Sequence, residues 1–187
     1  MRGESAPNFV AIDFETADYG ADSACAIGLV KVRGNRVVAK HAALIRPPRR
    51  SFVFTYLHGI RWGDVKAAPH FGDIWPALET HLDGADFVLA HNASFDRGVL
   101  ETCCAVHGLA APEIPYVCTV KLARAIWNIR PTRLPNVCRY LNIDLRNHHD
   151  AVADALACAR IGLAALKEGY PLTSGILGRS FPRRAIA

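Results

Sequence analysis

The stretch FVAIDFE at residues 9–15 is rich in β-branched and aromatic residues, which predicts a buried strand. Side chains two residues apart on a strand point to the same face, so Asp13 and Glu15 lie side by side, roughly 7 Å apart along the strand, while Phe14 turns into the core. Two neighbouring carboxylates repel each other and are poor strand formers. A strand end that frays into solvent accounts for such a pair, and so does a cation bound between the two side chains.

The chain around this strand predicts a hairpin followed by alternating strands and helices. Residues 24–33 and 36–45 are strand-like and meet at Gly34-Asn35, which is a two-residue hairpin signal. Further strands are predicted at 87–91 and 115–118, and helices at 70–81, 96–107, 119–127, 133–141 and 151–167, with a loop at 46–68. This order predicts one α/β domain with a mixed sheet at residues 1–170, followed by a basic, loosely held tail at 171–187.

The composition is typical of a folded domain with a single core. Of the 187 residues, 51% are apolar and 21% are charged. The longest apolar runs are far shorter than the roughly 20 residues that a membrane helix needs, so we expect no membrane association. The first residues lead quickly into a strand and leave no room for a signal peptide, which favours a cytoplasmic protein. The formal net charge of +5 favours a polyanionic partner.

Six cysteines are present, and they contain no Cys-x-x-Cys pair. Five of them lie within apolar helix-like or strand-like patterns. This distribution predicts reduced thiols in the core rather than a zinc site or a disulfide framework.

A third acidic residue follows the strand predicted at 87–91. The segment HNASFD, residues 91–96, runs from that strand into a polar turn, and Asp96 lies at the start of the next helix. The carboxyl ends of strands are where α/β sheets tend to bind ligands. Capping of the helix by Ser94 or Asp96 is an alternative explanation of the same residues.

The fourth acidic residue lies in the segment HHDAVAD, residues 148–154. Asp150 is a natural helix N-cap, which places Asp154 a little over one turn into the helix and close to packed backbone. His149 directly precedes that helix and is free to reach whatever Asp154 binds. The alternatives are an acid that only stabilises the helix N-terminus and a histidine on the ordinary surface.

Together, the four carboxylates and the histidine form one coherent chemical set. Hard divalent cations such as Mg²⁺ prefer oxygen ligands and keep several waters, so a few carboxylates suffice. Two such ions about 4 Å apart hold the attacking and leaving oxygens of a phosphodiester in line. A neutral imidazole deprotonates the attacking water. The sequence therefore predicts a metal-dependent site for phosphodiester hydrolysis.

These residues resemble the motifs of the DEDD superfamily of 3'→5' exonucleases, in its histidine-containing DEDDh branch (DnaQ-like), which includes the proofreading epsilon subunit of bacterial DNA polymerase III. The three motifs occur in order, as Asp13-Phe-Glu-Thr16, His91-Asn-Ala-Ser-Phe-Asp96, and His149 followed five residues later by Asp154. The resemblance covers residues 9–166. It implies a ribonuclease-H-like fold with a mixed five-stranded sheet flanked by helices.

The resemblance also implies a cofactor of two Mg²⁺ or Mn²⁺ ions per site. By motif position, Asp13 bridges both ions. Glu15 and Asp154 complete the site of one ion, and Asp96 binds the other through water.

The remaining roles follow from the same resemblance. It assigns the general base to His149 rather than His148, because only His149 has the family spacing to the final aspartate. It implies that Thr16 contacts the terminal 3'-hydroxyl through its main chain. The residues that it assigns to substrate binding are Phe14, Thr16, Leu57, His58, Asn92 and Phe95.

The implied function is removal of nucleoside 5'-monophosphates from the 3' ends of single-stranded DNA, in DNA repair or proofreading. An exoribonuclease that acts on RNA tails or short oligoribonucleotides is the alternative, because the sequence does not reveal contacts to the 2'-hydroxyl. An inactive nucleic-acid-binding module is a further alternative, against which stands the presence of all five site residues.

Two features depart from the family or lie outside it. Cys118-Thr119 stands where many members have Asp-Thr, which leaves the role of that position open. The tail has no recognisable clamp-binding motif, so a polymerase or clamp partner is not supported, and the oligomeric state stays open. The candidates for phosphate contacts, each with a solvated surface role as its alternative, are Arg46, Arg49, Arg50, Arg179, Arg183 and Arg184.

Overall fold

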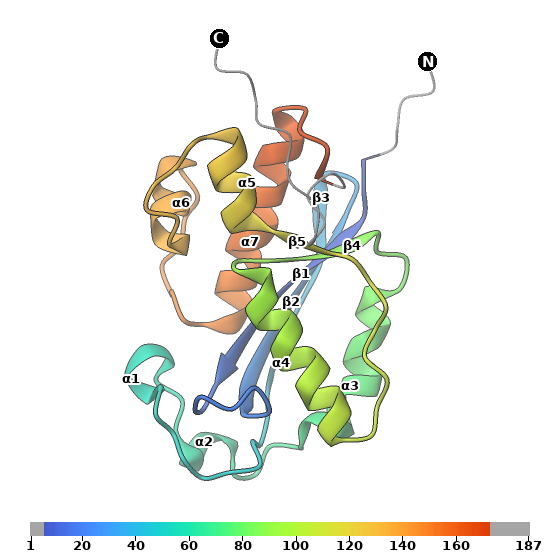
Figure 1. Cartoon of the computed structure of the whole chain (residues 1–187), viewed down its shortest axis with the longest axis vertical. Helices are drawn as coiled ribbons and strands as arrows, with labels where there is room; N and C mark the ends of the chain where they lie inside the picture. Colours follow the sequence, from blue (N-terminus) through green and yellow to red (C-terminus); the bar gives the residue numbers. More distant parts are fainter. Residues whose placement is uncertain (1–5, 173–187) are drawn as a thin grey trace.

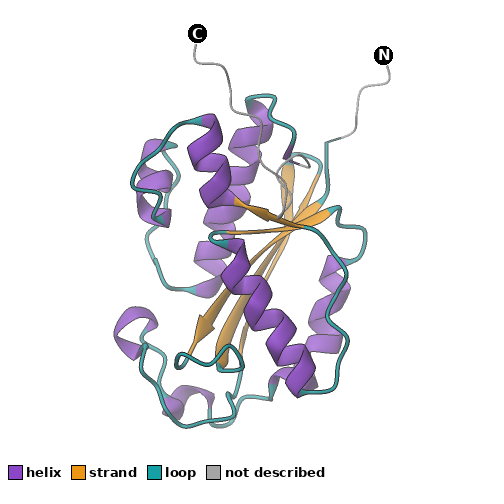
Figure 2. Ribbon diagram, viewed as in Figure 1, coloured by secondary structure: helices purple, strands orange, loops and turns teal. Residues whose placement is uncertain are grey.

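The computed structural model describes residues 6–172, and it consists of a five-stranded mixed sheet between two layers of helices (Figures 1 and 2). The strand order is β3-β2-β1-β4-β5. The first three strands pair antiparallel, whereas β4 pairs parallel with β1 and β5 pairs parallel with β4. The strands are β1 (Phe9–Thr16), β2 (Ala24–Arg33), β3 (Arg36–Leu44), β4 (Phe87–Ala90) and β5 (Tyr116–Cys118). The α/β fold with a mixed five-stranded sheet is therefore confirmed.

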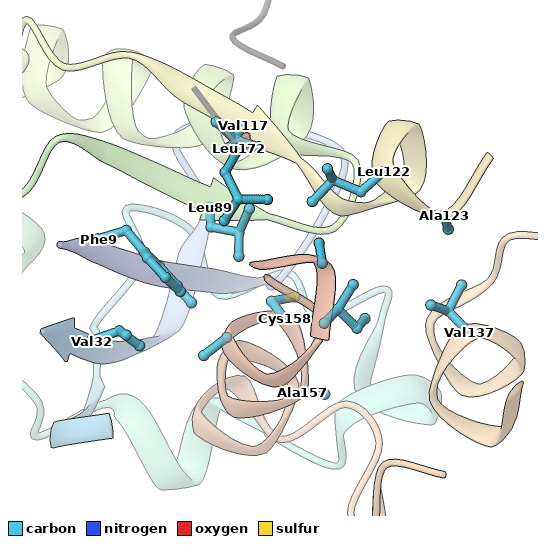
Figure 3. Packing of buried hydrophobic residues seen from close by; sticks show 14 of the residues in the cluster. Phe9, Val32, Leu89, Val117, Leu122, Ala123, Val137, Ala157, Cys158 and Leu172 are labelled. Carbon is cyan, nitrogen blue, oxygen red and sulfur yellow. The ribbon is translucent and has the colours of Figure 1, made fainter. Parts of the chain in front are cut away.

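The helices divide between the two faces of the sheet. One face carries α5 (Thr119–Ile126), α6 (Leu134–Tyr140) and α7 (Ala151–Lys167), and the other carries α3 (Phe71–Glu79), which continues into the 3₁₀ turn η1 (Thr80–Leu82), and α4 (Ala93–Val106) (Figure 1). Side chains of β1 alternate between these layers, as the strand period requires. Phe9 packs under α7, whereas Val10 and Phe14 pack under α3 and α4, so the predicted inward direction of Phe14 is confirmed. Figure 3 shows the layer under α7, where Phe9, Leu89 and Cys158 meet.

Several predicted element boundaries are wrong in detail. The loop predicted at 46–68 contains two short helices, α1 (Thr55–His58) and α2 (Trp62–Val65), which one turn of sequence pattern is too short to reveal. Helix α4 begins three residues before Asp96, so Asp96 lies in its first turn. Leu172 is buried in the core under α7, so its side chain belongs to the domain rather than to a loose tail. The rest of the predicted tail, with Arg179, Arg183 and Arg184, lies outside the described residues.

Two compositional expectations have structural counterparts. All six cysteines are buried and free, as predicted for core thiols. Within residues 6–172, no helix is long and apolar enough to cross a membrane.

The length of β1 creates the place where a site can form. β1 pairs with β4 from Phe9 to Ala11, and β4 ends one residue later, at Ala90. Asp13 and the residues after it therefore extend past the end of β4, and their edge on that side has no strand partner. Backbone groups left at such an edge need other partners. The chain that leaves β4 turns directly into α4 and provides one.

On the opposite face, the N-terminus of α7 lies directly on β2 at Gly28. Gly28 is the residue of β2 that pairs with Asp13. A Cβ atom at this position would overlap the backbone carbonyl of Ala151, the first residue of α7. A glycine here therefore allows the start of α7, with Asp154 one turn further on, to reach the level of Asp13.

We expect Gly28→Ala to push the start of α7 away from the sheet. Forcing a methyl group into packed backbone costs about 1–3 kcal/mol, so urea denaturation should give a lower free energy of unfolding. Gly98→Ala in α4 is the matched control, since its added methyl group meets no atom within 4 Å and alanine favours a helix interior. A Gly28→Ala protein as stable as the wild type would contradict this packing.

Candidate active site

The four predicted carboxylates converge at the carboxyl end of β1. Oxygens of Asp13, Glu15 and Asp154 all lie within 4.8 Å of one another, although these residues come from β1 and α7. Asp96 reaches the same place from α4, on the other side of the sheet, and its charge acts on Asp13. Glu15, Asp96 and Asp154 are all buried. Buried carboxylates gathered from three elements are not the frayed strand end that a lone Asp-x-Glu allows.

Asp96 is fixed by the free edge of β1. Its Oδ1 accepts a hydrogen bond of 3.1 Å from the backbone N–H of Phe14. Capping, the alternative explanation, is wrong for this helix: the N-cap of α4 is Asn92, in left-handed backbone conformation with φ 68°, and no side chain caps it. Asp96 thus occupies the position that a β4 carbonyl would take if β4 were longer.

Asp154 is held by the turn that precedes α7. Asp150 caps that helix through a 2.9 Å hydrogen bond from the N–H of Ala153, as predicted. Asp154 Oδ2 accepts a 3.0 Å hydrogen bond from the backbone N–H of His149, which has φ 70°. This bond fixes His149 five residues before Asp154 and beside it.

His148 makes a contact that the sequence did not reveal. Its Nδ1 lies 2.9 Å from Asp154 Oδ2, and its ring stacks on that of His149 with 3.8 Å between ring centroids. Both histidines therefore lie at the carboxylates, one touching Asp154 through its side chain and the other through its backbone. Burial, followed by the neighbouring His148, lowers the pKa of His149, and Asp154 opposes this shift. His149 is therefore neutral near pH 7, which is the form that accepts a proton.

The carboxyl groups themselves bind protons when no cation lies among them. Burial and then the charge of Asp154 raise the pKa of Glu15 to about 8. Burial raises the pKa of Asp96 to about 7, against the hydrogen bond from Phe14. Burial and the charges of Asp96 and Asp154 raise the pKa of Asp13 well above its ordinary value. An all-oxygen donor set with this strong an unfavourable charge fits hard divalent cations.

A cleft of about 820 Å³ opens over these carboxylates. Of the predicted substrate-binding residues, four line it: Phe14, Thr16, Leu57 and Phe95. Leu57 and Phe95 are large apolar side chains that are 42% and 46% exposed, an arrangement suited to contact with a base or sugar.

The other two predicted substrate-binding residues do not line the cleft. His58 lies behind Thr16: its Nδ1 accepts from the N–H of Ile60, so its Nε2 donates to the carbonyl of Thr16 at 3.2 Å. His58 therefore positions Thr16. Asn92 forms the left-handed turn before α4 and lines a neighbouring groove instead.

Two residues that the sequence did not single out, His91 and Arg133, also line the cleft. His91 Nε2 donates to the carbonyl of Thr132 at 2.8 Å, and its Nδ1 accepts from the hydroxyl of Thr119 at 2.7 Å. Burial lowers the pKa of His91 to about 4, so the ring stays neutral. Thr119 makes no cap bond at α5 and holds His91 instead. The place of His91 in the segment HNASFD was the available signal, whereas Arg133 gave none.

The raised carboxyl pKa values predict how the metal-free protein responds to pH. The folded state keeps protons that the unfolded state has lost, up to about pH 8 for Glu15, so the free energy of unfolding falls as pH rises. Above about pH 6.5 histidines are neutral in both states and do not oppose this trend. In EDTA, the midpoint of thermal unfolding should therefore fall between pH 6.5 and 8.

The controls for this measurement are two glutamine variants. Glu15→Gln should flatten the fall, whereas Glu113→Gln, which removes an exposed carboxyl elsewhere, should keep it. Saturating Mg²⁺ should also flatten it. A midpoint in EDTA that does not change with pH would contradict the assigned electrostatics.

Comparisons with known proteins agree with this geometry. A family model described as RNase_T, exonuclease, matches residues 10–161. Among curated proteins, the DNA polymerase III PolC-type of Oceanobacillus iheyensis is 33% identical over 153 residues, covering 80% of this chain and 11% of that protein. The corresponding protein of Thermotoga maritima is 31% identical over 159 residues, covering 83% and 12%. The chain thus spans about a tenth of the length of these relatives.

Solved structures share the fold at lower identity. The nuclease domain of 3'hExo, a DEDDh family member bound to rAMP, has a TM-score of 0.80 and 18% identity, with 94% of this chain and 98% of that chain covered. Exonuclease X in complex with 5' overhanging duplex DNA has a TM-score of 0.69 and 24% identity, with 89% and 96% covered. These likenesses confirm the predicted ribonuclease-H-like exonuclease fold.

Proposed function

The chain belongs to the RNase_T exonuclease family and is a 3'→5' exonuclease, and from this premise we propose that it removes nucleoside 5'-monophosphates from the 3' ends of single-stranded DNA with two Mg²⁺ or Mn²⁺ ions. The observation that carries the proposal is the convergence of Asp13, Glu15 and Asp154 within 4.8 Å, with Asp96 beside them. The placement of that cluster at the floor of a large cleft gives a nucleic-acid strand access to it.

The carboxylates divide the work of holding the ions. Asp13 lies between the Glu15–Asp154 side and the Asp96 side, so it suits a residue shared by both ions. Glu15 and Asp154 would complete one site, and Asp96 the other. When bound, such ions neutralise the charge that develops on the phosphodiester and favour ionisation of the attacking water.

His149 is proposed as the general base. It lines the cleft, it is neutral near pH 7, and its backbone bond to Asp154 holds it beside the carboxylates. Its ring takes the proton from the water as the new P–O bond forms. Asp154 offsets the positive charge that the ring then carries.

The 3'-terminal nucleotide is proposed to lie between Thr16 and the two exposed apolar side chains. His58 holds the carbonyl of Thr16, which leaves the backbone N–H side of that turn to meet the 3'-hydroxyl. Leu57 and Phe95 present apolar surface to the base and sugar. Contacts of this kind select a strand end rather than a sequence.

The proposed preference for DNA rests on the relatives. The curated proteins with the highest similarity are named DNA polymerases, and Exonuclease X was solved with DNA, whereas the 3'hExo domain was solved with a ribonucleotide. We propose DNA repair or proofreading in the cytoplasm as the setting. An RNA substrate is the outcome that would redirect this assignment.

The direct test is digestion of 5'-end-labelled single-stranded DNA, duplex DNA and RNA of one sequence, read as product ladders. We expect a ladder that shortens from the 3' end, fastest on single-stranded DNA. We expect no cleavage in excess EDTA and recovery on adding Mg²⁺ or Mn²⁺. Asp13→Asn and Asp96→Asn should both be inactive while they stay folded. Cleavage that persists in EDTA would remove the metal-ion mechanism.

A second prediction separates the two histidines. A general base contributes roughly 10²- to 10⁴-fold in rate, so His149→Ala should slow single-turnover cleavage by about that factor. The wild-type rate should rise with pH as the base loses its proton, and this rise should lie below the ordinary histidine range because the pKa of His149 is lowered. His148→Ala should cost much less at saturating metal, since its side chain touches Asp154 but lacks the family spacing. The reverse order of effects would show that the base is His148.

A further inference from the structure

A second groove, of about 470 Å³, adjoins the catalytic cleft and shares His91 and Arg133 with it. It runs along the start of α5 and the loop that leads to α6. The residues that line it are His91, Asn92, Val120, Arg124, Arg130, Pro131, Thr132 and Arg133. Three of them are arginines, and none is acidic.

The three arginines carry charge that the described part of the chain does not neutralise. Arg124, Arg130 and Arg133 are all exposed, and within residues 6–172 none of them forms an ion pair with a carboxylate. Arg49, one of the arginines predicted to contact phosphate, is different: it pairs with both Asp18 and Asp22, at 3.0 and 2.6 Å. Free cationic side chains are therefore found at this groove rather than at Arg49.

The loop that carries these side chains is held in place by two hydrogen bonds to Thr132. His91 donates to the carbonyl of Thr132 at 2.8 Å, and Arg124 Nη2 donates to its hydroxyl at 3.1 Å. An arginine has five N–H donors, so Arg124 keeps others for a ligand. The groove is thus anchored to the cleft through His91.

We propose that this groove binds the phosphate backbone of the substrate strand upstream of the nucleotide being removed, with Arg124, Arg130 and Arg133 as the phosphate contacts. The proposal rests on the proposed function. A strand whose 3' end lies at the carboxylates leaves the cleft past Arg133, where the groove begins. Guanidinium groups bind phosphate oxygens in a bidentate manner, and such contacts set affinity without reading sequence.

The test compares substrates that do and do not reach the groove. Arg124→Gln/Arg130→Gln should bind a fluorescein-labelled dT15, measured by anisotropy in EDTA, roughly tenfold or more weakly than the wild type. The log–log salt dependence of that affinity should become shallower by about 1.4, because each phosphate that a single strand no longer has neutralised lowers the slope by about 0.7. Hydrolysis of the p-nitrophenyl ester of thymidine 5'-monophosphate should change little, because this substrate has no upstream phosphate.

Two further variants make the test specific. Arg33→Gln/Arg36→Gln removes the same charge from exposed residues at the other end of the sheet and should leave dT15 binding unchanged. Arg124→Lys/Arg130→Lys keeps the charge and should keep most of the salt dependence.

The outcomes separate this proposal from the proposed function. Unchanged dT15 binding by the double glutamine variant, or an equal loss of affinity in the Arg33/Arg36 control, would overturn the groove. Binding of poly-glutamate as tight as dT15, and abolished in the same variant, would assign the groove to an acidic protein and also overturn it. A wild-type protein that cleaves neither dT15 nor the ester would refute the proposed function instead.

Discussion

Mutual repulsion among four carboxylates is the constraint on which the rest of this structure depends. Glu15, Asp96 and Asp154 are buried with Asp13 at one strand end, at a cost that only protons or cations relieve. Three structural features hold the groups together against that repulsion. β1 extends past β4, the exposed N–H of Phe14 binds Asp96, and Gly28 admits the start of α7. Each feature serves the site more than the core, since a longer β4 or a larger residue on β2 would pack a sheet equally well.

The sequence predicts much of this site because its chemistry is written locally. Asp13 and Glu15 share a strand face by the strand period alone, and the capping role of Asp150 sets the level of Asp154 within its helix. The ordered motifs then connect these local pieces to one family and one fold. No local signal, however, shows that Asp96 replaces a missing strand partner, because that contact joins residues 82 positions apart.

Features that depend on the folded chain were beyond the reach of the sequence for the same reason. His148 differs from His149 by one position, and only the left-handed turn at His149 brings the side chain of one residue and the backbone of the other onto Asp154. Two helices of one turn each, α1 and α2, are too short to leave a periodic pattern. Arg49 and Arg133 look alike in the sequence, yet Arg49 is neutralised by Asp18 and Asp22, whereas Arg133 lies open at the junction of cleft and groove.

The central claim is that the carboxylates exist to hold two divalent ions, with Asp13 shared between them. The measurement that tests it most directly is a Mn²⁺ titration followed by electron paramagnetic resonance, in the presence of thymidine 5'-monophosphate as the product. The account predicts two bound Mn²⁺ per wild-type chain with magnetic coupling between them, and loss of the coupled pair in Asp13→Asn. Binding of no Mn²⁺, or of a pair that Asp13→Asn leaves unchanged, would contradict it.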